Sequence, residues 1–389
     1  MSRLDELIRE LCPDGVVHLP LGKVCDVDKG VQFNKTDMQE TGSYPVINGG
    51  INPSGYIEQY NQAENTITIS QGGASAGYVN WLHVKFWAGA HCYVLKPKDC
   101  IENRYLYHFV KANERKLQEC QYGAGIPALG KATVIDLSIP VPPLTVQREI
   151  VRILDNFTEL TAELTAELTA RQRQYNYYRN KMFFQIEAPT KTIPEIAYTY
   201  IGLVTTMTKH YVSRGIRLIH NSDIKQNRID FKEDIYLDEP FAEANATRRH
   251  QKDDIITVHT GDVGTSAIID KELEGSLGFA TIVTRIIDKN KVLPQYVCHF
   301  LNSQINKHNI VKLIKSDRNN LNLKDFNKLT IPIPSIEEQK RIVSLLDHFN
   351  IICNDINNGL PAEIAARQKQ YEYYRDKLLT FQQKEEAST

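Results

Sequence analysis

The sequence contains two copies of one unit, and this duplication constrains the fold more than any other feature. Residues 139–157 (IPVPPLTVQREIVRILDNF) recur 192 positions later at 331–349 (IPIPSIEEQKRIVSLLDHF), and residues 170–181 recur 196 positions later at 366–377. Weaker matches, offset by 189 to 191 positions, extend the duplication toward the N-terminus: Thr66–Ile69 with Ile255–Val258, Gly72 with Gly261, Gly89 with Gly278, and Tyr105-x-x-His108-Phe109 with Tyr296-x-x-His299-Phe300. Two copies of one unit predict two similar domains with two similar sites.

Length and composition predict a folded chain of two to three domains. The 389 residues are 42% hydrophobic, which is enough for a separate core in each domain. The sequence has no apolar run of the roughly 18 residues that a membrane span needs, and residues 1–14 read as a charged helix rather than a signal peptide. We therefore expect a cytoplasmic protein with no membrane partner.

Cysteine spacing and net charge exclude two simple classes. The seven cysteines have no CxxC spacing, which argues against a disulfide framework or a structural zinc site, and no other metal site is predicted. The net charge of −1 argues against a polycation that binds any nucleic acid. Any surface that binds an anion must be local, and basic stretches at 209–232 and 312–328 are candidates.

Two kinds of segment alternate along the chain. Residues 15–143 and about 190–335 are rich in Gly, Asn, Thr, Val and Ile, with short apolar runs at 66–70 and 254–259, and they predict strand-rich domains. Each of them ends in Ile-Pro-x-Pro, which prevents helix, and a helix is predicted directly afterwards.

The two helical segments carry the seam of a coiled coil. From 145 to 185, apolar residues follow alternating spacings of four and three, with two polar interruptions at Thr161 and Arg171. The second copy keeps this seam except for one extra residue of spacing between Leu360 and Ile364, a four-residue insertion relative to the first copy, so we expect a kink near Gly359-Leu360-Pro361. Because each helix has one apolar seam, each needs a partner, and the other copy is the nearest equivalent surface. An antiparallel pair is therefore expected.

A short repeat lies inside the first helix. Residues 158–160 read TEL and are followed by two TAEL units at 161–164 and 165–168. Such a repeat is commonly helical filler of good helix formers. It is also an adjustable spacer, because adding or deleting one unit changes the helix by about 6 Å and about 40°.

Sequence motifs of catalysis are weak. Gly125 to Lys131 resembles a phosphate-binding loop, but it is one residue short of the motif because Ala132 replaces the Ser or Thr that holds magnesium. Residues 132–139 also read as a strand, where the motif needs a helix. His83 and His91 could meet Asp99 or Cys92, yet a lone histidine near apolar residues is more often a core residue. No catalytic residue is predicted.

Glycine-rich polar loops follow an apolar run at the same place in both halves. The first is Ser70-Gln71-Gly72-Gly73-Ala74-Ser75, and the second is His259-Thr260-Gly261-Asp262-Val263-Gly264. Glycine permits close approach of a backbone, and the polar side chains are of the types that contact base edges. Most such loops are only turns, but a duplicated and divergent pair favours a binding role.

At these residues the sequence resembles the specificity subunit of type I restriction-modification systems. The resemblance rests on the Ile-Pro-x-Pro segments, on Gln147-x-x-Ile150-Val151-x-x-Leu154-Asp155 and its copy from Gln339 to Asp347, on the TAEL units and on the doubled Arg-Gln-x-Gln-Tyr-x-Tyr-Tyr-Arg. It covers the whole chain. It departs from the family at the start of the second domain, where Ile193-Pro194-Glu195-Ile196 is a poor match to Leu19-Pro20-Leu21-Gly22.

The resemblance implies an α+β fold with two strand-rich target recognition domains separated by two long antiparallel helices in a coiled coil, related by a pseudo-twofold tandem duplication. Each recognition domain would read one half of a split target in double-stranded DNA. The helical regions would space the half-sites, in step with the number of TAEL units, and dock two modification (methyltransferase) subunits, which restriction (translocase and nuclease) subunits would join. S-adenosylmethionine, ATP and Mg²⁺ would belong to those partners, so no cofactor is expected on this chain.

The boundaries that we predict on this basis are an N-terminal helix at 1–14, recognition domains at 15–143 and 188–335, helical regions at 144–187 and 336–384, and a tail at 385–389. The helical residues expected to space the domains or dock partners are Leu154, Phe157, Leu164, Leu168, Tyr175, Tyr178, Leu346, Phe349, Tyr371 and Tyr374.

Candidate DNA contacts fall into two groups. The basic residues expected to contact phosphates are Lys29, Lys35, Lys85, Lys131, Lys209, Arg214, Arg248, Arg249, Arg318 and Lys324. The polar residues expected to read bases are Asn48, Asn52, Gln71, Ser75, His220, Asn221, His259, Thr260, Asn319 and Asn320.

Two other functions remain open at this point. One is a structural coiled-coil adaptor that joins two protein-binding domains without DNA, which the near-neutral charge permits. The other is a nucleotide hydrolase that uses Lys131.

Overall fold

The computed structural model describes residues 2–123, 125–314, 320–355 and 358–384, and these divide into two compact units. Unit 1 consists of residues 1–163 and 364–389, and unit 2 consists of residues 164–363. The division passes through the two long helical regions, so each unit combines one strand-rich domain with parts of both. No helix in the described ranges is both long and apolar enough to cross a membrane.

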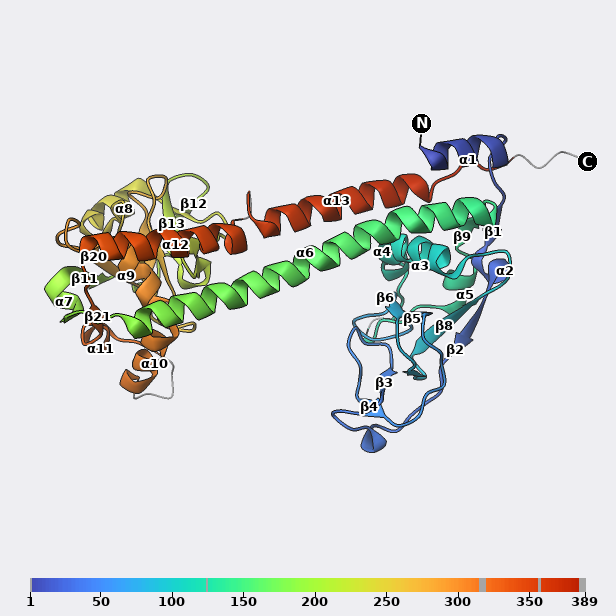
Figure 1. The fold of residues 1–389 in the computed structure, drawn as a ribbon, viewed down its shortest axis with the longest axis horizontal. Coiled ribbons are helices and arrows are strands. Elements are labelled where there is room, and N and C mark those ends of the chain that lie inside the picture. Colours follow the sequence, from blue (N-terminus) through green and yellow to red (C-terminus); the bar gives the residue numbers. More distant parts are fainter. Residues whose placement is uncertain (1, 124, 315–319, 356–357, 385–389) are drawn as a thin grey trace, which may run out of the picture. The chain divides into compact units, whose positions relative to one another are not determined.

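Unit 1 is built on a four-stranded antiparallel sheet (Figure 1). Its strands in spatial order are β2 (Cys25–Lys29), β8 (Cys92–Pro97), β5 (Thr66–Ser70) and β6 (Val79–Leu82). A second sheet contains β4 (Tyr56–Ile57), β3 (Tyr44–Ile47) and β7 (Trp87–Ala88), with β3 and β7 parallel, and β1 (His18–Pro20) pairs with β9 (Ser138–Pro140). The β-branched Ile67 and Ile69 of β5 are fully buried, which is why this short run forms a central strand.

Unit 2 repeats this arrangement and adds one strand to its second sheet and one further two-stranded pair. Its main sheet contains β11 (Ala197–Ile201), β20 (Thr281–Ile286), β17 (Ile255–Val258) and β18 (Ser266–Ile268), and its second sheet contains β12 (Tyr211–Val212), β16 (Tyr236–Leu237), β13 (Ile216–His220) and β19 (Leu277–Phe279). Strands β13 and β19 are parallel, like β3 and β7. Two further pairs are β14 (Ile224–Lys225) with β15 (Arg228–Ile229) and β10 (Thr190–Thr192) with β21 (Thr330–Pro332). The duplication therefore covers both sheets of each unit.

Short helices complete the two units. In unit 1 they are α1 (Arg3–Leu11), α2 (Leu21–Val24), α3 (Asn103–Ala112), α4 (Glu114–Glu119) and α5 (Lys131–Ile135). In unit 2 they are α7 (Ile193–Ile196), α8 (Glu239–Ala244), α9 (Pro294–Leu301), α10 (Gln304–Leu313) and α11 (Leu323–Phe326). Single turns of 3-10 helix lie at Lys35–Asp37, Thr208–His210, Asn221–Asp223 and Ala246–Arg248.

The second domain begins with the same strand and helix as the first, although its sequence there matches poorly. Strand β10 and helix α7 stand where β1 and α2 stand in unit 1, because β10 pairs with β21 as β1 pairs with β9. Ile193 and Ile196 are buried, as are Leu21 and Val24. Residues 193–196 are therefore the structural equivalent of residues 21–24, despite their different sequence.

The strand expected at 132–139 is wrong in its first half. Residues Lys131–Ile135 form helix α5, and only Ser138–Pro140 form a strand. The run of Thr133, Val134 and Ile135 favours a strand locally, but burial of Val134 in the core overrides that preference. Ala132 still lacks the hydroxyl that a phosphate-binding loop requires.

The long helices are α6 (Leu144–Gln185), α12 (Ile336–Asn354) and α13 (Leu360–Leu378). Within unit 1, α13 lies beside the first half of α6 and runs in the opposite direction, and Tyr374 stacks on Phe157 with ring centroids 5.4 Å apart (Figure 1). Within unit 2, α12 lies beside the second half of α6, where Phe349 stacks on Tyr175 and Tyr178 at 6.2 and 5.8 Å. The antiparallel pairing of the two copies is confirmed.

Near Gly359, where a kink was expected, the structure has two separate helices: α12 ends at Asn354 and α13 begins at Leu360. Here the backbone N–H of Gly359 donates to the carbonyl of Asp355, and a Cβ on Gly359 would lie 2.5 Å from the carbonyl oxygen of Ile351. The backbone packs so closely here that a residue without a side chain is required between the two helices.

Candidate nucleic-acid interface

In unit 1 the glycine-rich loop after β5 is held between two other segments. The backbone N–H of Gln71 donates to the carbonyl of His91 at 2.9 Å, and the carbonyl of Gln71 accepts from the N–H of Leu129 at 2.7 Å. Next to it, the N–H of Gly73 donates to the carbonyl of Pro127 at 2.9 Å, and φ at Gly73 is +79°. The loop is therefore fixed by the fold rather than being a simple turn.

Asn48, which directly follows strand β3, also contacts His91. Its side-chain oxygen accepts from the backbone N–H of His91 at 3.3 Å. Gly49 follows with φ +87°, and a Cβ there would lie 2.7 Å from the carbonyl oxygen of His91. Two predicted base readers, Asn48 and Gln71, thus converge on the exposed residue His91. From the sequence alone, His91 stands out only as a possible base or ligand, because its place between these two loops depends on strand pairing that the sequence pattern does not show.

In unit 2 three predicted base readers come together. The ring Nδ1 of His259 is hydrogen-bonded to Oδ1 of Asn320 at 2.8 Å, Thr260 forms a bridge with Asn320, and the N–H of Leu321 donates to the carbonyl of His259 at 2.8 Å. These contacts correspond to the Gly72–Ala128 bridge and the Leu129–Gln71 hydrogen bond of unit 1. The backbone connections are therefore the same in the two units, whereas the side chains differ.

Several of these polar groups are poorly satisfied within the protein. Oε1 of Gln71, Nε2 of His220 and Oδ1 of Asn221 are buried and have no hydrogen-bond partner in the described part of the chain. His220 ends β13, and its ring lies 5.4 Å from that of Phe279. Buried polar groups are nearly always paired in folded proteins, so these unpaired atoms favour an external partner. Asn52 is exposed and Ser75 is half-buried.

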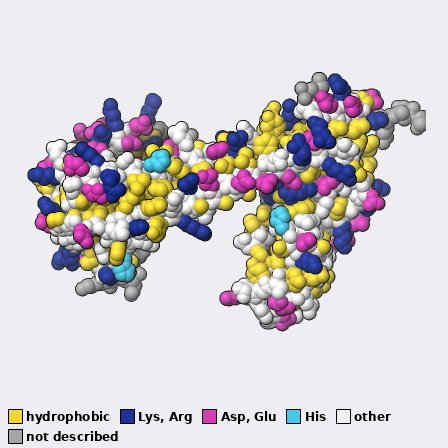
Figure 2. All heavy atoms as spheres, in the orientation of Figure 1, with side chains coloured by type: hydrophobic (Ala, Val, Ile, Leu, Met, Phe, Trp, Pro, Cys, Tyr) yellow, Lys and Arg dark blue, Asp and Glu magenta, His cyan; other side chains and the backbone are white. Residues whose placement is uncertain are grey.

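Most of the predicted phosphate contacts lie on the surface. Lys29, Lys35, Lys131, Lys209, Arg214 and Lys324 are exposed. Others already have contacts within the protein: Lys85 lies 4.7 Å from the ring centroid of Tyr60, Arg248 donates to the carbonyl of Gly202, and Arg249 pairs with Glu239 and Glu243. Arg318 and Asn319 lie outside the described residues. On the face drawn in Figure 2, basic and acidic side chains are interspersed, in keeping with a net charge near zero.

Each domain is joined to its helical region by the same anchors. The side chain of Gln147 at the start of α6 accepts from the N–H of Glu102 and donates to the carbonyls of Cys100 and Pro142. Gln339 at the start of α12 accepts from the N–H of Leu293 and donates to the carbonyls of Lys291 and Pro334. Both glutamines are fully buried.

A tyrosine from the helix of each domain adds a second anchor. The hydroxyl of Tyr105 donates to the carbonyl of Pro140 at 3.1 Å, and that of Tyr296 donates to the carbonyl of Pro332 at 2.6 Å. These repeated anchors explain why the prolines and the glutamine of this segment recur in both copies.

The helical residues expected to space the domains or dock partners fall into two groups. Leu154, Tyr175 and Leu346 are buried, and Leu164, Leu168, Phe157, Phe349 and Tyr371 are half-buried along the seam. Tyr178 and Tyr374 are 36% and 40% exposed. The second group has surface available for a partner, whereas the first contributes to packing within each unit.

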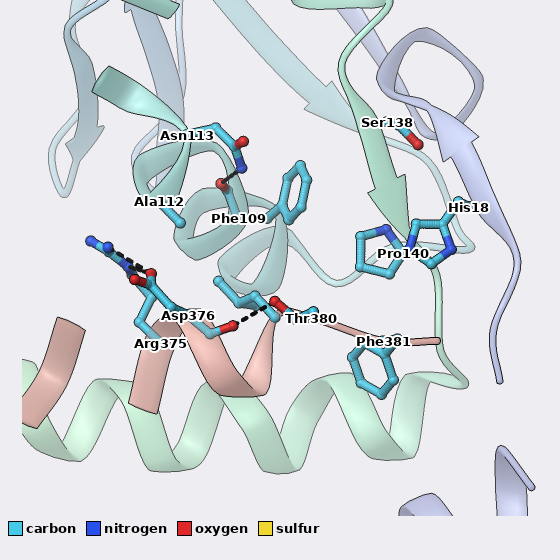
Figure 3. A pocket seen from close by; sticks show the side chains of 11 residues that line it. His18, Phe109, Ala112, Asn113, Ser138, Pro140, Arg375, Asp376, Thr380 and Phe381 are labelled. Atoms are coloured by element: carbon cyan, nitrogen blue, oxygen red, sulfur yellow. Dashed lines mark hydrogen bonds and ion pairs between the residues drawn. The ribbon is translucent and has the colours of Figure 1, made fainter. Parts of the chain in front are cut away.

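A hollow of about 430 Å³ lies in unit 1 between α3, β9 and the end of α13 (Figure 3). Several polar groups that line it pair with each other: Arg375 with Asp376, Thr380 with the carbonyl of Asp376, and Asn113 with the carbonyl of Phe109. None of the predicted DNA contacts lines it. Among the described residues, no group of three or more His, Cys, Asp or Glu side chains is placed to hold a metal ion.

Comparisons with known proteins place the chain in a family. The model of the type I restriction modification DNA specificity domain matches residues 13–171 and 195–366. A putative type I restriction enzyme specificity subunit of Haemophilus influenzae is 35% identical over 93% of this chain and 94% of its own length, and the EcoR124I/EcoR124II specificity subunit of Escherichia coli is 31% identical over 100% and 99%.

Solved structures show the same fold. The S subunit of a type I restriction-modification system from M. genitalium has a TM-score of 0.62 at 18% identity, covering 94% of this chain and 96% of that one. The duplicated domain, the paired helices and the sequence relatives agree, and the chain belongs to the family of type I restriction-modification specificity subunits.

Proposed function

We propose that this chain selects the DNA target of a type I restriction-modification complex, with residues 15–143 reading one half-site and residues 188–335 reading the other. The observation that carries the proposal is the contrast between the two copies. The anchors at Gln147 and Gln339 are the same, whereas the loops at 70–75 and 259–264 occupy the same position with different side chains. Conserved attachment with divergent loops is expected of two domains that read two different sequences.

The assignment of contacts follows from position. Asn48, Gln71, His220, Asn221, His259, Thr260 and Asn320 are proposed to contact base edges. Gln71, His259 and Thr260 lie in the two loops, Asn48 and Asn320 are hydrogen-bonded to His91 and His259 beside them, and Gln71, His220 and Asn221 carry buried atoms without a partner in the described part of the chain. The exposed lysines and arginines are proposed to contact phosphates and to position the duplex. Near-neutral net charge then makes non-specific binding weak, which suits a protein whose role is selection.

The partners of the complex follow from the family. Two modification subunits, which hold S-adenosylmethionine, are proposed to dock on the helical regions 144–187 and 336–384, and restriction subunits, which use ATP and Mg²⁺, join them. The duplicated and partly exposed tyrosines Tyr178 and Tyr374 supply two similar surfaces for two copies of one partner. The chain itself supplies selectivity and no chemistry.

Mapping of methylated adenines in cells with and without this gene tests the function. The expected result is a two-part motif with a fixed spacer that is methylated only when the gene is present. An unchanged methylation map contradicts DNA selection and favours the adaptor alternative, which family membership does not support. A matched strain with the gene deleted and restored on a plasmid controls for effects on neighbouring genes.

A further inference from the structure

A buried hydrogen-bonded joint occurs twice in the structure, once in each unit. In unit 1 the ring of His108, on α3, is hydrogen-bonded through Nε2 to Oδ1 of Asp155 on α6 at 2.8 Å and through Nδ1 to the hydroxyl of Tyr371 on α13 at 3.1 Å. In unit 2 the ring of His299, on α9, makes the same contacts with Asp347 on α12 at 2.8 Å and with Tyr175 on α6 at 3.3 Å. The side chains of His108 and His299 are 0% and 2% exposed.

The roles of the three groups in each joint are defined by their chemistry. In a neutral imidazole one ring nitrogen donates and the other accepts; since the carboxylate can only accept, Nε2 donates to it and Nδ1 accepts from the tyrosine hydroxyl. Burial raises the pKa of both Tyr371 and Tyr175 to about 12, so both hydroxyls keep the proton that they donate. Additional contacts from Arg104 to Asp155 and from Asn227 to Tyr175 hold the outer members in place.

Each joint connects three elements that the chain separates. The histidine belongs to the recognition domain, the aspartate to the helix that follows that domain, and the tyrosine to the helical region of the other copy. Tyr371 lies in the second helical region but completes unit 1, and Tyr175 lies in the first but completes unit 2. The joint therefore fixes a domain to both helices at once.

The position of the joint along the helix gives it a directional role. Gln147 anchors the start of α6 to its domain, and Asp155 lies eight residues further on, about 12 Å along the helix axis. Gln339 and Asp347 have the same separation in α12. Two separated attachment points define the direction of a helix relative to its domain, whereas one attachment point leaves it free to pivot.

We propose that the two joints, Tyr371–His108–Asp155 and Tyr175–His299–Asp347, are positioning elements that restrict the protein to one spacer length between its half-sites. This rests on the proposed function. A recognition domain that can pivot on its helix presents its loops at a range of distances from the other half-site. Targets with one base pair more or less in the spacer then become acceptable, while the sequence of each half-site stays the same.

Tyrosine-to-phenylalanine substitutions test this in the complete complex. Tyr371→Phe and Tyr175→Phe keep the packed rings but leave a buried Nδ1 without a donor, a loss that shifts an equilibrium about fivefold. Matched controls are Tyr373→Phe and Tyr177→Phe, two residues away in the same repeat, where the rings are 62% and 59% exposed. The readout is adenine methylation in cells that express the partner subunits, at targets with the native spacer and with one base pair added or removed.

The expected result is a roughly fivefold rise in methylation of altered-spacer targets relative to native ones in each joint variant, with no rise in the controls. An unchanged ratio in both joint variants overturns the proposal, and so does an equal fall at every spacing, which would indicate a merely structural loss. If a tyrosine variant does not accumulate, Asp155→Ala or Asp347→Ala breaks the same joint and is judged by the same ratio. Wild-type protein that yields no two-part motif refutes the proposed function instead, so the two failures are distinguishable.

Discussion

At the scale of single residues, His250 makes the stability of unit 2 depend on pH. Its ring is 1% exposed, with Nδ1 hydrogen-bonded to the hydroxyl of Ser276 at 2.9 Å, and burial lowers its pKa to about 4. An unfolded histidine has a pKa near 6.5. Between about pH 6.5 and 4, His250 is therefore protonated in the unfolded chain but remains neutral in the folded chain. The free energy of unfolding should fall by up to about 3 kcal/mol as pH decreases through this window.

Urea unfolding at a series of pH values measures this effect, with His250→Leu as the variant that cannot titrate. Its pH dependence should be shallower than that of the wild type across this range, and His308→Leu, at an exposed position of the same unit, should leave the slope unchanged. Equal slopes for wild type and His250→Leu would contradict the prediction.

Residue-level contacts were only partly predictable from the sequence. The residue types and positions of the loops were visible, because glycine and polar residues after an apolar run recur at one offset. The meeting of His259 with Asn320 was not, since 61 residues separate them and only strand pairing brings them together. Likewise, Arg249 is identifiable as a surface cation, but its pairing with Glu239 and Glu243 depends on how α8 folds back.

At the scale of elements, the TAEL units of α6 predict a change of spacing. Deleting residues 165–168 shortens a continuous helix by about 6 Å and rotates its remaining C-terminal part by about 40°, without removing a buried side chain. The half-site sequences should stay the same while the spacer between them shortens. Methylation mapping of the deletion strain measures both, and an unchanged spacer contradicts the prediction. Replacing the same four residues with alanine keeps the length and is the control.

Secondary structure was predicted correctly where a periodic pattern of apolar residues extends over many turns. The seam of α6 extends over many turns and identifies the helix to within one residue at its start, whereas the Lys131–Ile135 segment is a single turn whose β-branched residues favour a strand. The four-residue insertion located the place where α12 and α13 separate, but it did not predict the residues at which the two helices end and begin. Whether a short segment forms a helix or a strand depends on tertiary packing, which cannot be predicted from the local sequence.

At the scale of the whole molecule, the two-unit organisation predicts that the two half-sites are read independently. Gln71 lies in unit 1 and His259 in unit 2, and each belongs to the loop after the central strand of its own sheet. Gln71→Ala should reduce discrimination by about 1–3 kcal/mol at a position of one half-site, and His259→Ala should do the same in the other. Lys35→Ala, at an exposed position, should weaken all sequences alike.

Competition binding of the assembled complex, against duplexes with single substitutions in each half-site, separates these outcomes. Each loop variant serves as the control for the other, since they share the complex, the helices and the anchors and differ only in the unit that is altered. Reduced discrimination confined to opposite half-sites requires two reading domains within one chain. If either variant changed both half-sites, the loops would not act separately, and the division of labour inferred from the duplicated anchors and divergent loops would be wrong.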